Sequence, residues 1–165
     1  KKILNFDMYK NEKFIEISYN QVDLISDIAS NINRNNGGVL FVDYRYYGKK
    51  MFDSIQCIKN HKKVKLLDGV GDRDITHLIN FKLLKQILEK NGLKVNGYTT
   101  QGEFLKKMGI FERAEILSKK TSFLKKSNIY FRLKRLTDKN EMGNLFKVIF
   151  ATKKGNRFDY GFINV

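Results

Sequence analysis

An apolar run that directly follows a helix and two glycines most limits how this chain can fold. Val39–Val42 is an uninterrupted run of four apolar residues, which is typical of a strand covered on both faces in a parallel sheet between helices. A helix is predicted before it over Asn20–Arg34, and Gly37 and Gly38 suit the left-handed geometry that ends a helix. A helix that turns straight into a buried strand is the repeating unit of an α/β sheet.

Alternation and helical periodicity extend this pattern along the chain. They predict a strand at Phe14–Ile17, a helix at Phe81–Lys90 with Asn80 as its cap, and strands at Leu93–Thr100 and Leu145–Thr152. The piece between Tyr44 and Ile79 is predicted to be irregular, and its length indicates a functional or mobile loop.

Helical signals fill the space between the last two strands. A helical segment starts at Gln101 and breaks at Gly109, a second helix follows, and a basic helical stretch covers Ser122–Leu136. Asp138 followed by Glu141 is a helix-start signature. We interpret residues 101–140 as a helical insertion within a single partial domain, residues 1–165.

Composition excludes several classes of site. The chain has one cysteine and two histidines, so neither a disulfide framework nor a metal-ligand motif is present, and we expect no metal. No apolar run reaches the length of a membrane span and no secretory leader precedes the first strand, so we expect no membrane partner. We expect a cytoplasmic location, or a mitochondrial one if the source is eukaryotic.

The net charge of +15 is a usual footprint of a nucleic-acid binder. Here the charge is mostly scattered Lys in a chain rich in Asn and Ile and without Pro, and no RNA-binding aromatic pattern accompanies it. A solvated Lys-rich surface therefore accounts for the charge better than a nucleic-acid site does.

Several carboxylates lie at strand ends or loop starts rather than on helical faces. Asp43 follows the apolar run, and the carboxyl ends of strands are where ligands bind in open α/β sheets. Any two of these carboxylates can orient a cation such as a guanidinium, which favours bidentate acceptors: Asp43, Asp72, Asp74 and Glu103. For Glu103 a simpler interpretation is that it complements the positive end of a helix.

Three other features have ordinary alternatives. VKLLDGVGDRD (residues 64–74) imitates a cofactor loop, but only Gly69 and Gly71 are present and a polar loop explains it better. His61 and His77 have no nucleophile in a motif and are interpreted as surface or capping residues. The tyrosines and cations after Asp43 either stack a base or line a loop over the sheet edge: Tyr44, Arg45, Tyr46, Tyr47, Lys49 and Lys50.

Five stretches, in order and spacing, resemble the MidA-like methyltransferases, whose mitochondrial members assist assembly of respiratory complex I. They are GGVLFVDYRYY (37–47), DSIQCIKNH (53–61), GDRDIT (71–76), TQGEFLKKMGIFERAEIL (100–117) and EMGNLFKVIFA (141–151). The resemblance implies a Rossmann-type, S-adenosylmethionine-dependent methyltransferase fold, with protein arginine methylation described for mitochondrial members. It also implies that Gly37–Asp43 is the fifth strand, and that Leu93–Thr100 and Leu145–Thr152 are the closing antiparallel strands.

The resemblance also has departures. The family's glycine-rich cofactor turn and the acidic residue after its second strand are expected upstream of this sequence. Arg45 stands where the family usually has Gly, Leu78 replaces a His, and Asn80 replaces an Asp. Asn caps a helix about as well as Asp does.

We therefore predict an α/β fold that is the carboxyl-terminal half of a Rossmann-type methyltransferase sheet with a helical insertion. Alone, the chain is predicted to bind no S-adenosylmethionine and to be inactive. It is then either one piece of a split enzyme, with a complementary amino-terminal half as partner, or the product of a decaying gene, and the family resemblance implies a protein substrate. The alternative is a non-enzymatic basic module that binds an acidic protein or RNA. A poorly folded relic without activity is a third possibility. Catalytic and cofactor-binding residues are not assigned, and the candidates for orienting groups on the acceptor side are Asp43, Tyr44, Asp74, Thr76, Gln101 and Glu103.

Overall fold

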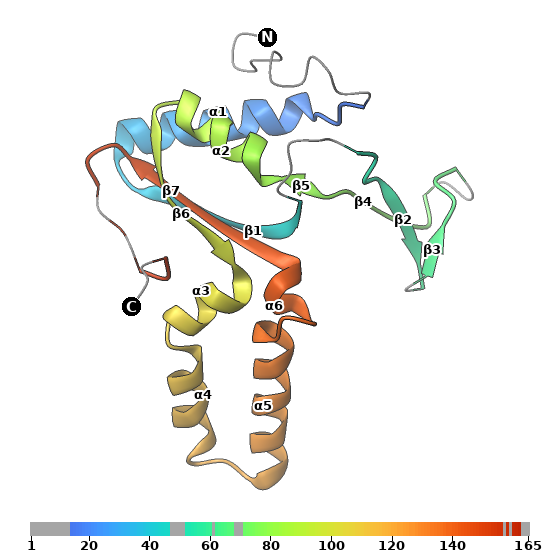
Figure 1. Ribbon diagram of the computed structural model, residues 1–165, viewed down its shortest axis with the longest axis vertical. Coiled ribbons are helices and arrows are strands. Elements are labelled where there is room, and N and C mark those ends of the chain that lie inside the picture. Colours follow the sequence, from blue (N-terminus) through green and yellow to red (C-terminus); the bar gives the residue numbers. More distant parts are fainter. Residues whose placement is uncertain are drawn as a thin grey trace.

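A four-stranded sheet organises the protein. The computed structural model describes residues 14–46, 52–60, 62–67, 71–156, 158 and 160–162 (Figure 1). The strand order is β5-β1-β7-β6, with bounds β5 Ile79–Asn80, β1 Gly38–Tyr46, β7 Phe146–Lys153 and β6 Leu93–Thr100. β7 is antiparallel to both of its neighbours, whereas β5 pairs with β1 in parallel through two residue pairs. This confirms the predicted strand after the first helix and the antiparallel strands that close the sheet, whereas its place as a fifth strand stays a prediction.

Helix α1, Tyr19–Asn35, confirms the predicted first helix. The Ser18 side chain caps it by accepting from the backbone N–H of Gln21 at 3.3 Å. Asn36 and Gly37 follow with φ of 68° and 115°, so left-handed backbone ends the helix and turns the chain into β1.

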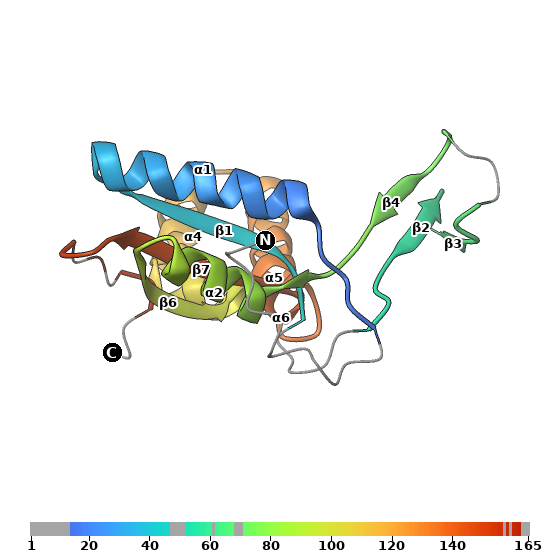
Figure 2. The same ribbon diagram turned by 90° about the horizontal axis from the view of Figure 1, so that it is seen from above.

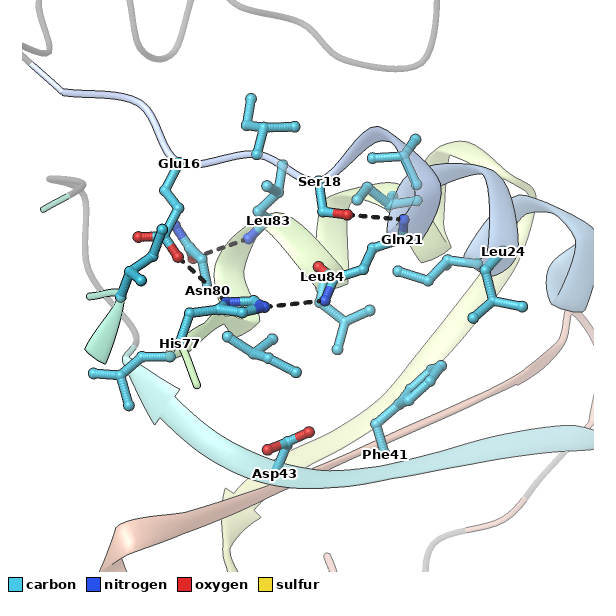
Figure 3. Close-up of a pocket in the computed structure, with 17 residues that line it drawn as sticks. Glu16, Ser18, Gln21, Leu24, Phe41, Asp43, His77, Asn80, Leu83 and Leu84 are labelled. Atoms are coloured by element: carbon cyan, nitrogen blue, oxygen red, sulfur yellow. Dashed lines mark hydrogen bonds and ion pairs between the residues drawn. The ribbon is translucent and has the colours of Figure 1, made fainter. Parts of the chain in front are cut away.

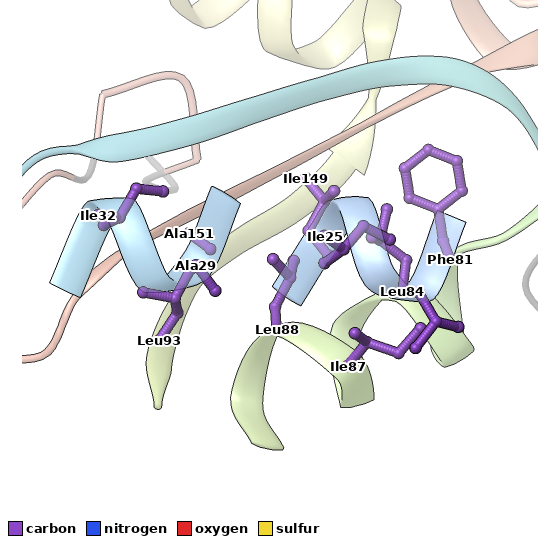
Figure 4. Close-up of a cluster of buried hydrophobic side chains, with 11 residues drawn as sticks. Ile25, Ala29, Ile32, Phe81, Leu84, Ile87, Leu88, Leu93, Ile149 and Ala151 are labelled. Carbon is purple, nitrogen blue, oxygen red and sulfur yellow. The ribbon is translucent and has the colours of Figure 1, made fainter. Parts of the chain in front are cut away.

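Helices α1 and α2 cover one face of the sheet (Figure 2). Helix α2, Phe81–Lys90, has the predicted bounds, and the Asn80 side chain accepts from the N–H groups of Lys82 and Leu83. The core lies between these two helices and the sheet (Figure 4), and its buried members are Val22, Ile25, Ala29, Ile32, Phe81, Leu84, Ile87, Leu88, Leu93, Ile149 and Ala151.

The prediction that the run in β1 is covered on both faces is wrong. Val39 and Phe41 pack against the core, but Leu40, Val42 and Tyr44 on the opposite face are exposed. Alternate residues of a strand point to opposite faces, and α1 and α2 cover only one of them. The prediction of a mainly parallel environment is wrong too, because the long partner of β1 is the antiparallel β7.

The segment between β6 and β7 is helical, and it extends from the sheet on the side opposite α1 and α2 (Figure 1). It contains α3 Gln101–Lys107, α4 Ile110–Ser118, α5 Phe123–Thr137 and α6 Met142–Leu145. Gly109, with φ of 79°, separates α3 from α4 as predicted. The predicted helix start at Asp138 and Glu141 is wrong, because Asp138 ends α5 and Glu141 precedes α6 without a side-chain cap.

The piece predicted to be irregular contains a second, small sheet. Its antiparallel strand order is β3-β2-β4, with β2 Gln56–Lys59, β3 Lys62–Val64 and β4 Asp74–Thr76. These strands are three or four residues long, which is too short for alternation to predict them.

The predicted strand at Phe14–Ile17 does not form, and these residues carry no regular structure. Among the described strands none pairs with them, and side-chain contacts hold them instead. Ile17 packs against the core, and the Glu16 carboxylate accepts hydrogen bonds from Ser54.

A glycine contact fixes the helical segment to the end of the sheet. A Cβ atom on Gly102 would lie 2.6 Å from the carbonyl oxygen of Thr137. We expect Gly102→Ala to lower the free energy of unfolding by about 2 kcal/mol, because backbone atoms cannot yield as a side chain can. Urea unfolding measures this, with exposed Asn128→Ala as the control, which should stay within about 0.5 kcal/mol. Equal effects of the two variants would contradict the close contact.

Candidate functional site

A cavity of about 420 Å³ lies between α1, α2 and the carboxyl-terminal part of β1 (Figure 3). Its walls are mostly apolar, since they include Val22, Leu24, Ile25, Phe41, Ile55, Leu78, Ile79, Leu83, Leu84 and Ile87. The first turns of both helices border it, because Ser18 and Asn80, the caps of α1 and α2, are among its lining residues. Ligands bind at this edge in open α/β sheets.

A network of hydrogen-bonded polar side chains borders the cavity. The Nδ1 atom of His77 lies 3.2 Å from Oε1 of Glu16, and its Nε2 atom lies 3.4 Å from Nε2 of Gln21 (Figure 3). Glu16 comes from the segment before α1 and His77 from the turn before β5. These contacts join segments that are about 60 residues apart in the sequence.

Ser54, which lies on a third segment, completes this polar network. Its backbone N–H and its hydroxyl both donate to the Glu16 carboxylate, at 3.1 and 3.0 Å. The same hydroxyl oxygen accepts from the backbone N–H of Leu78 at 2.9 Å. The buried Ser54 side chain therefore ties the segment before α1 to the segment that carries His77.

Asp43 is the one predicted site residue that lines this cavity. It is half-buried, and Figure 3 shows its carboxylate pointing from β1 into the cavity. One oxygen, Oδ1, accepts from the backbone N–H of Tyr44 at 2.7 Å. Two carboxylates, Asp43 and Glu16, thus face a mostly apolar space. Such a space suits a ligand with an apolar stem and a cationic head.

The structure places the other candidates elsewhere. Tyr44 lies on the opposite face of β1, where its ring packs on Phe146 with a centroid distance of 4.1 Å. Asp74 and Thr76 belong to β4 of the small sheet. Asp74 is exposed, whereas the Thr76 hydroxyl is buried without a hydrogen-bond partner among the described residues.

Gln101 and Glu103 lie at the start of α3. The buried Gln101 amide donates to the carbonyl of Leu136 at 3.0 Å and to that of Met142 at 3.5 Å. The exposed Glu103 carboxylate pairs with Lys106 at 3.1 Å. The six candidates therefore do not form one cluster, and their acceptor-side role stays a prediction.

Sequence reasoning missed Glu16 and Ser54 and gave His77 only a surface or capping role. A lone Glu in a presumed strand and a lone Ser in a presumed loop carry no periodic signal. The resemblance to the family did draw attention to His77, because it stands beside Leu78 where the family has a His. Tyr47, Lys49, Lys50, His61 and Gly69 lie outside the described residues, and the side chains of Arg45 and Tyr46 also lie outside the description.

The described residues that line the cavity include no glycine. Gly38 is packed against Phe150 and the backbone of β7, so it offers no room to a ligand. Gly71 is exposed in the turn before the small β4 strand. No group of three potential metal-ligand side chains occurs in the described parts of the chain either.

A scan against protein families identifies the chain. The family model described as "Putative S-adenosyl-L-methionine-dependent methyltransferase" matches residues 2–99, which is more than half of the chain. The chain belongs to this methyltransferase family. The match confirms the resemblance to MidA-like methyltransferases.

The curated relatives that the chain matches are named as mitochondrial proteins. "Protein arginine methyltransferase NDUFAF7, mitochondrial" of Xenopus tropicalis is 28% identical over 81% of this chain and 31% of its own length. The Drosophila melanogaster homologue of that methyltransferase is 32% identical over 74% of this chain and 28% of its own length. The chain therefore spans about a third of the length of these relatives.

Solved structures share the fold of this methyltransferase family member. An uncharacterised superfamily protein from Burkholderia thailandensis superposes with a TM-score of 0.78 at 21% identity, over 96% of this chain and 45% of the other. A likely methyl transferase from the same organism, bound to S-adenosyl-homocysteine, gives 0.65 at 23% identity, over 87% and 36%. Of the helices in the described ranges, none has the length and hydrophobicity that crossing a membrane requires.

Ser54 provides a test of the polar network beside the cavity. We expect Ser54→Ala to lower the free energy of unfolding by about 1.5 kcal/mol, because Glu16 loses a donor and the Leu78 N–H loses its acceptor. Guanidinium or urea unfolding measures the change. Ser122→Ala is the matched control, because Ser122 is exposed and makes no capping bond. If Ser54→Ala lowers the free energy of unfolding no more than this control does, the polar network does not contribute to stability.

Proposed function

We propose that this chain is the carboxyl-terminal, acceptor-side part of an S-adenosylmethionine-dependent protein arginine methyltransferase, and that it transfers no methyl group alone. The donor-binding part of the fold is supplied by a complementary amino-terminal half. S-adenosylmethionine, when held by the complete fold, supplies the methyl group on a sulfonium that is already a good leaving group. The residues of this chain then have to bind and orient the acceptor.

The observation that carries this proposal is the free edge of β1. β7 pairs with β1 along Gly38–Tyr44, but on the other edge β1 meets β5 only at Arg45 and Tyr46. Within the described residues, no strand pairs with Gly38–Tyr44 on that side. An unpaired row of backbone donors and acceptors is a template for another strand. The parallel direction of β5 is the direction that a fourth strand of a Rossmann-type sheet would take.

The exposed face of β1 supports the same conclusion. Leu40, Val42 and Tyr44 point away from α1 and α2 and remain exposed. Helices on both faces of a mostly parallel sheet are the rule in this fold class. A complementary half that supplies a strand to the edge of β1 and a helix to this face would bury all three side chains.

The cavity supports an arginine as the acceptor. An arginine side chain has an apolar stem and a planar cationic head, and the cavity offers apolar walls with Asp43 and Glu16 at its polar border. Glu16 is already engaged with Ser54 and His77. We therefore assign the orienting role to Asp43. The relatives named as protein arginine methyltransferases are consistent with this substrate class.

Calorimetry tests whether binding of the methyl donor requires the second half of the fold. The isolated chain is expected to bind S-adenosylmethionine more weakly than micromolar, because its sequence contains no complete glycine-rich cofactor turn. Co-expression with the product of the preceding reading frame should yield a complex that binds the donor. Micromolar binding by the isolated chain would refute its dependence on a second half.

Asp43 is tested in that complex. We expect Asp43→Asn to leave donor binding within about twofold and to lower methyl transfer to an arginine peptide about thirtyfold, because one partner of a charge-assisted pair is lost. Asp72→Asn is the control, because Asp72 is exposed and its described ion pair, with Lys59, lies at the surface. If the rate of methyl transfer is unchanged in Asp43→Asn, Asp43 does not orient the acceptor.

A further inference from the structure

The tip of the α4–α5 hairpin combines the most exposed apolar side chains of its helices with a dense positive charge. We define the hairpin tip as residues 117–126, which join the end of α4 to the start of α5. Phe123 is 87% exposed and Leu124 is 74% exposed, and Leu117 beside them is also exposed. Folding leaves these apolar side chains in water, which is unfavourable unless something else covers them.

The charge from the last turn of α4 to the end of α5 has one sign. Residues 116–137 contain seven Lys and Arg residues and no Asp or Glu. Four of the seven belong to the tip, and all four are exposed: Lys119, Lys120, Lys125 and Lys126. Only Lys119 has an ion pair among the described residues, a long one of 3.9 Å with the exposed Glu115. In the tip, exposed apolar side chains therefore lie among four lysines, and the described residues provide an ion pair for only one of these lysines.

The hairpin holds this tip away from the body of the protein. α4 and α5 extend from the sheet as a pair, and the tip is their far end (Figure 1). α5 has 15 residues, so it is about 22 Å long. Few side chains of the two helices are buried, namely Ala114 and Ser118 in α4 and Leu133 and Thr137 in α5. The other apolar residues of the hairpin, such as Ile116 and Phe131, stay exposed.

We propose that the hairpin tip binds the surface of a membrane that contains anionic lipid. Phe123 and Leu124 would enter the boundary between headgroups and acyl chains, and the four lysines would contact the lipid phosphates. Aromatic and aliphatic side chains flanked by Lys are the composition of interfacial membrane anchors. Each Lys near an anionic surface strengthens the attraction, and the attraction falls with salt.

A membrane suits this tip better than the other anionic partners do. RNA would use the lysines and stack a base on Phe123, but it would leave Leu117 and Leu124 in water. An acidic protein would need a concave apolar surface to receive a convex tip, whereas a lipid surface is flat and deformable. The sequence-based expectation of no membrane partner considered only spans and leaders. Binding at the surface needs neither, because a short tip inserts only part of the way.

Vesicle sedimentation tests the proposal with the purified 165-residue chain. Vesicles of phosphatidylcholine with 30% phosphatidylglycerol, a mole fraction chosen to be on the order of that in anionic membranes, are compared with pure phosphatidylcholine vesicles. We expect binding to the anionic vesicles only, and about tenfold weaker binding when salt is raised from about 50 to about 200 mM. Equal binding to both vesicles, or no binding to the anionic ones, would overturn the proposal.

Two variants separate the parts of the tip. Phe123→Ser with Leu124→Ser is expected to weaken vesicle binding about tenfold, because two apolar side chains no longer insert. Leu67→Ser, in the turn that follows β3, is the control, because Leu67 is 81% exposed and lies outside the hairpin. Changing the four tip lysines to Glu should weaken binding a hundredfold or more, on the order of 1 kcal/mol for each lysine.

A charge-matched control excludes an effect of net charge alone. The exposed lysines Lys62, Lys63, Lys65 and Lys154 lie outside the hairpin, and changing them to Glu alters the net charge by the same amount. This control should retain most of the vesicle binding. All variants alter exposed side chains, so their circular dichroism and thermal unfolding should match those of the parent chain.

RNA is the competing outcome of the same experiment. If the chain retards RNA in a gel, and if RNA binding survives the Phe123 and Leu124 changes but is lost with the four tip lysines, the hairpin is an RNA site and the membrane proposal fails. Loss of vesicle binding in both tip variants, with retention in Leu67→Ser and in the charge-matched control, supports the proposal.

Discussion

The antiparallel pairing of β7 between β1 and β6 is the interaction on which the rest of the structure depends. β7 comes from the carboxyl-terminal part of the chain, and it pairs with Gly38–Tyr44 on one side and with Leu93–Thr100 on the other. Val148, Ile149 and Ala151 of β7 are fully buried. Without β7, β1 and β6 would not be joined, and α1 and α2 would have no continuous sheet to pack against.

The same strand also places the helical hairpin and the cavity on opposite sides of the sheet. β6 leads into α3 and β7 begins after α6, so the insertion leaves and re-enters the sheet at one end. Gln101 and Gly102 hold that junction through the carbonyls of Leu136 and Thr137. The cavity lies under α1 and α2 on the other face. An acceptor site and a membrane-facing tip can therefore operate from one small scaffold without sharing side chains.

The two proposals use different properties of this scaffold. The free edge and exposed face of β1 concern backbone pairing and apolar burial, which a second polypeptide half can complete. The membrane proposal rests on the hairpin tip, where lysines lie beside exposed apolar side chains. Attachment of the tip to a lipid surface would leave the edge of β1 accessible, because the hairpin extends away from the sheet.

Much of the fold could be predicted because its long elements carry strong local signals. The bounds of α2 and β6 agree with the prediction to the residue, since Asn80 caps the helix and left-handed glycine at Gly92 ends it. The failures have physical reasons. The strands of the small sheet are too short to show alternation, and no strand of the described ranges lies beside Phe14–Ile17 to pair with it.

The candidate site could be predicted only in part, and Asp43 illustrates why. Its position at the carboxyl end of a strand is a local property, so the sequence alone determined that it would lie at the ligand edge of the sheet. The sequence likewise determined the family, the helices, the capping residues and the charge of the hairpin. Only the tertiary structure decided that Glu16, Ser54 and His77 meet beside Asp43, and that Gln101 supports a junction. Such contacts join segments tens of residues apart, and their geometry depends on the packing of the whole sheet rather than on any local pattern.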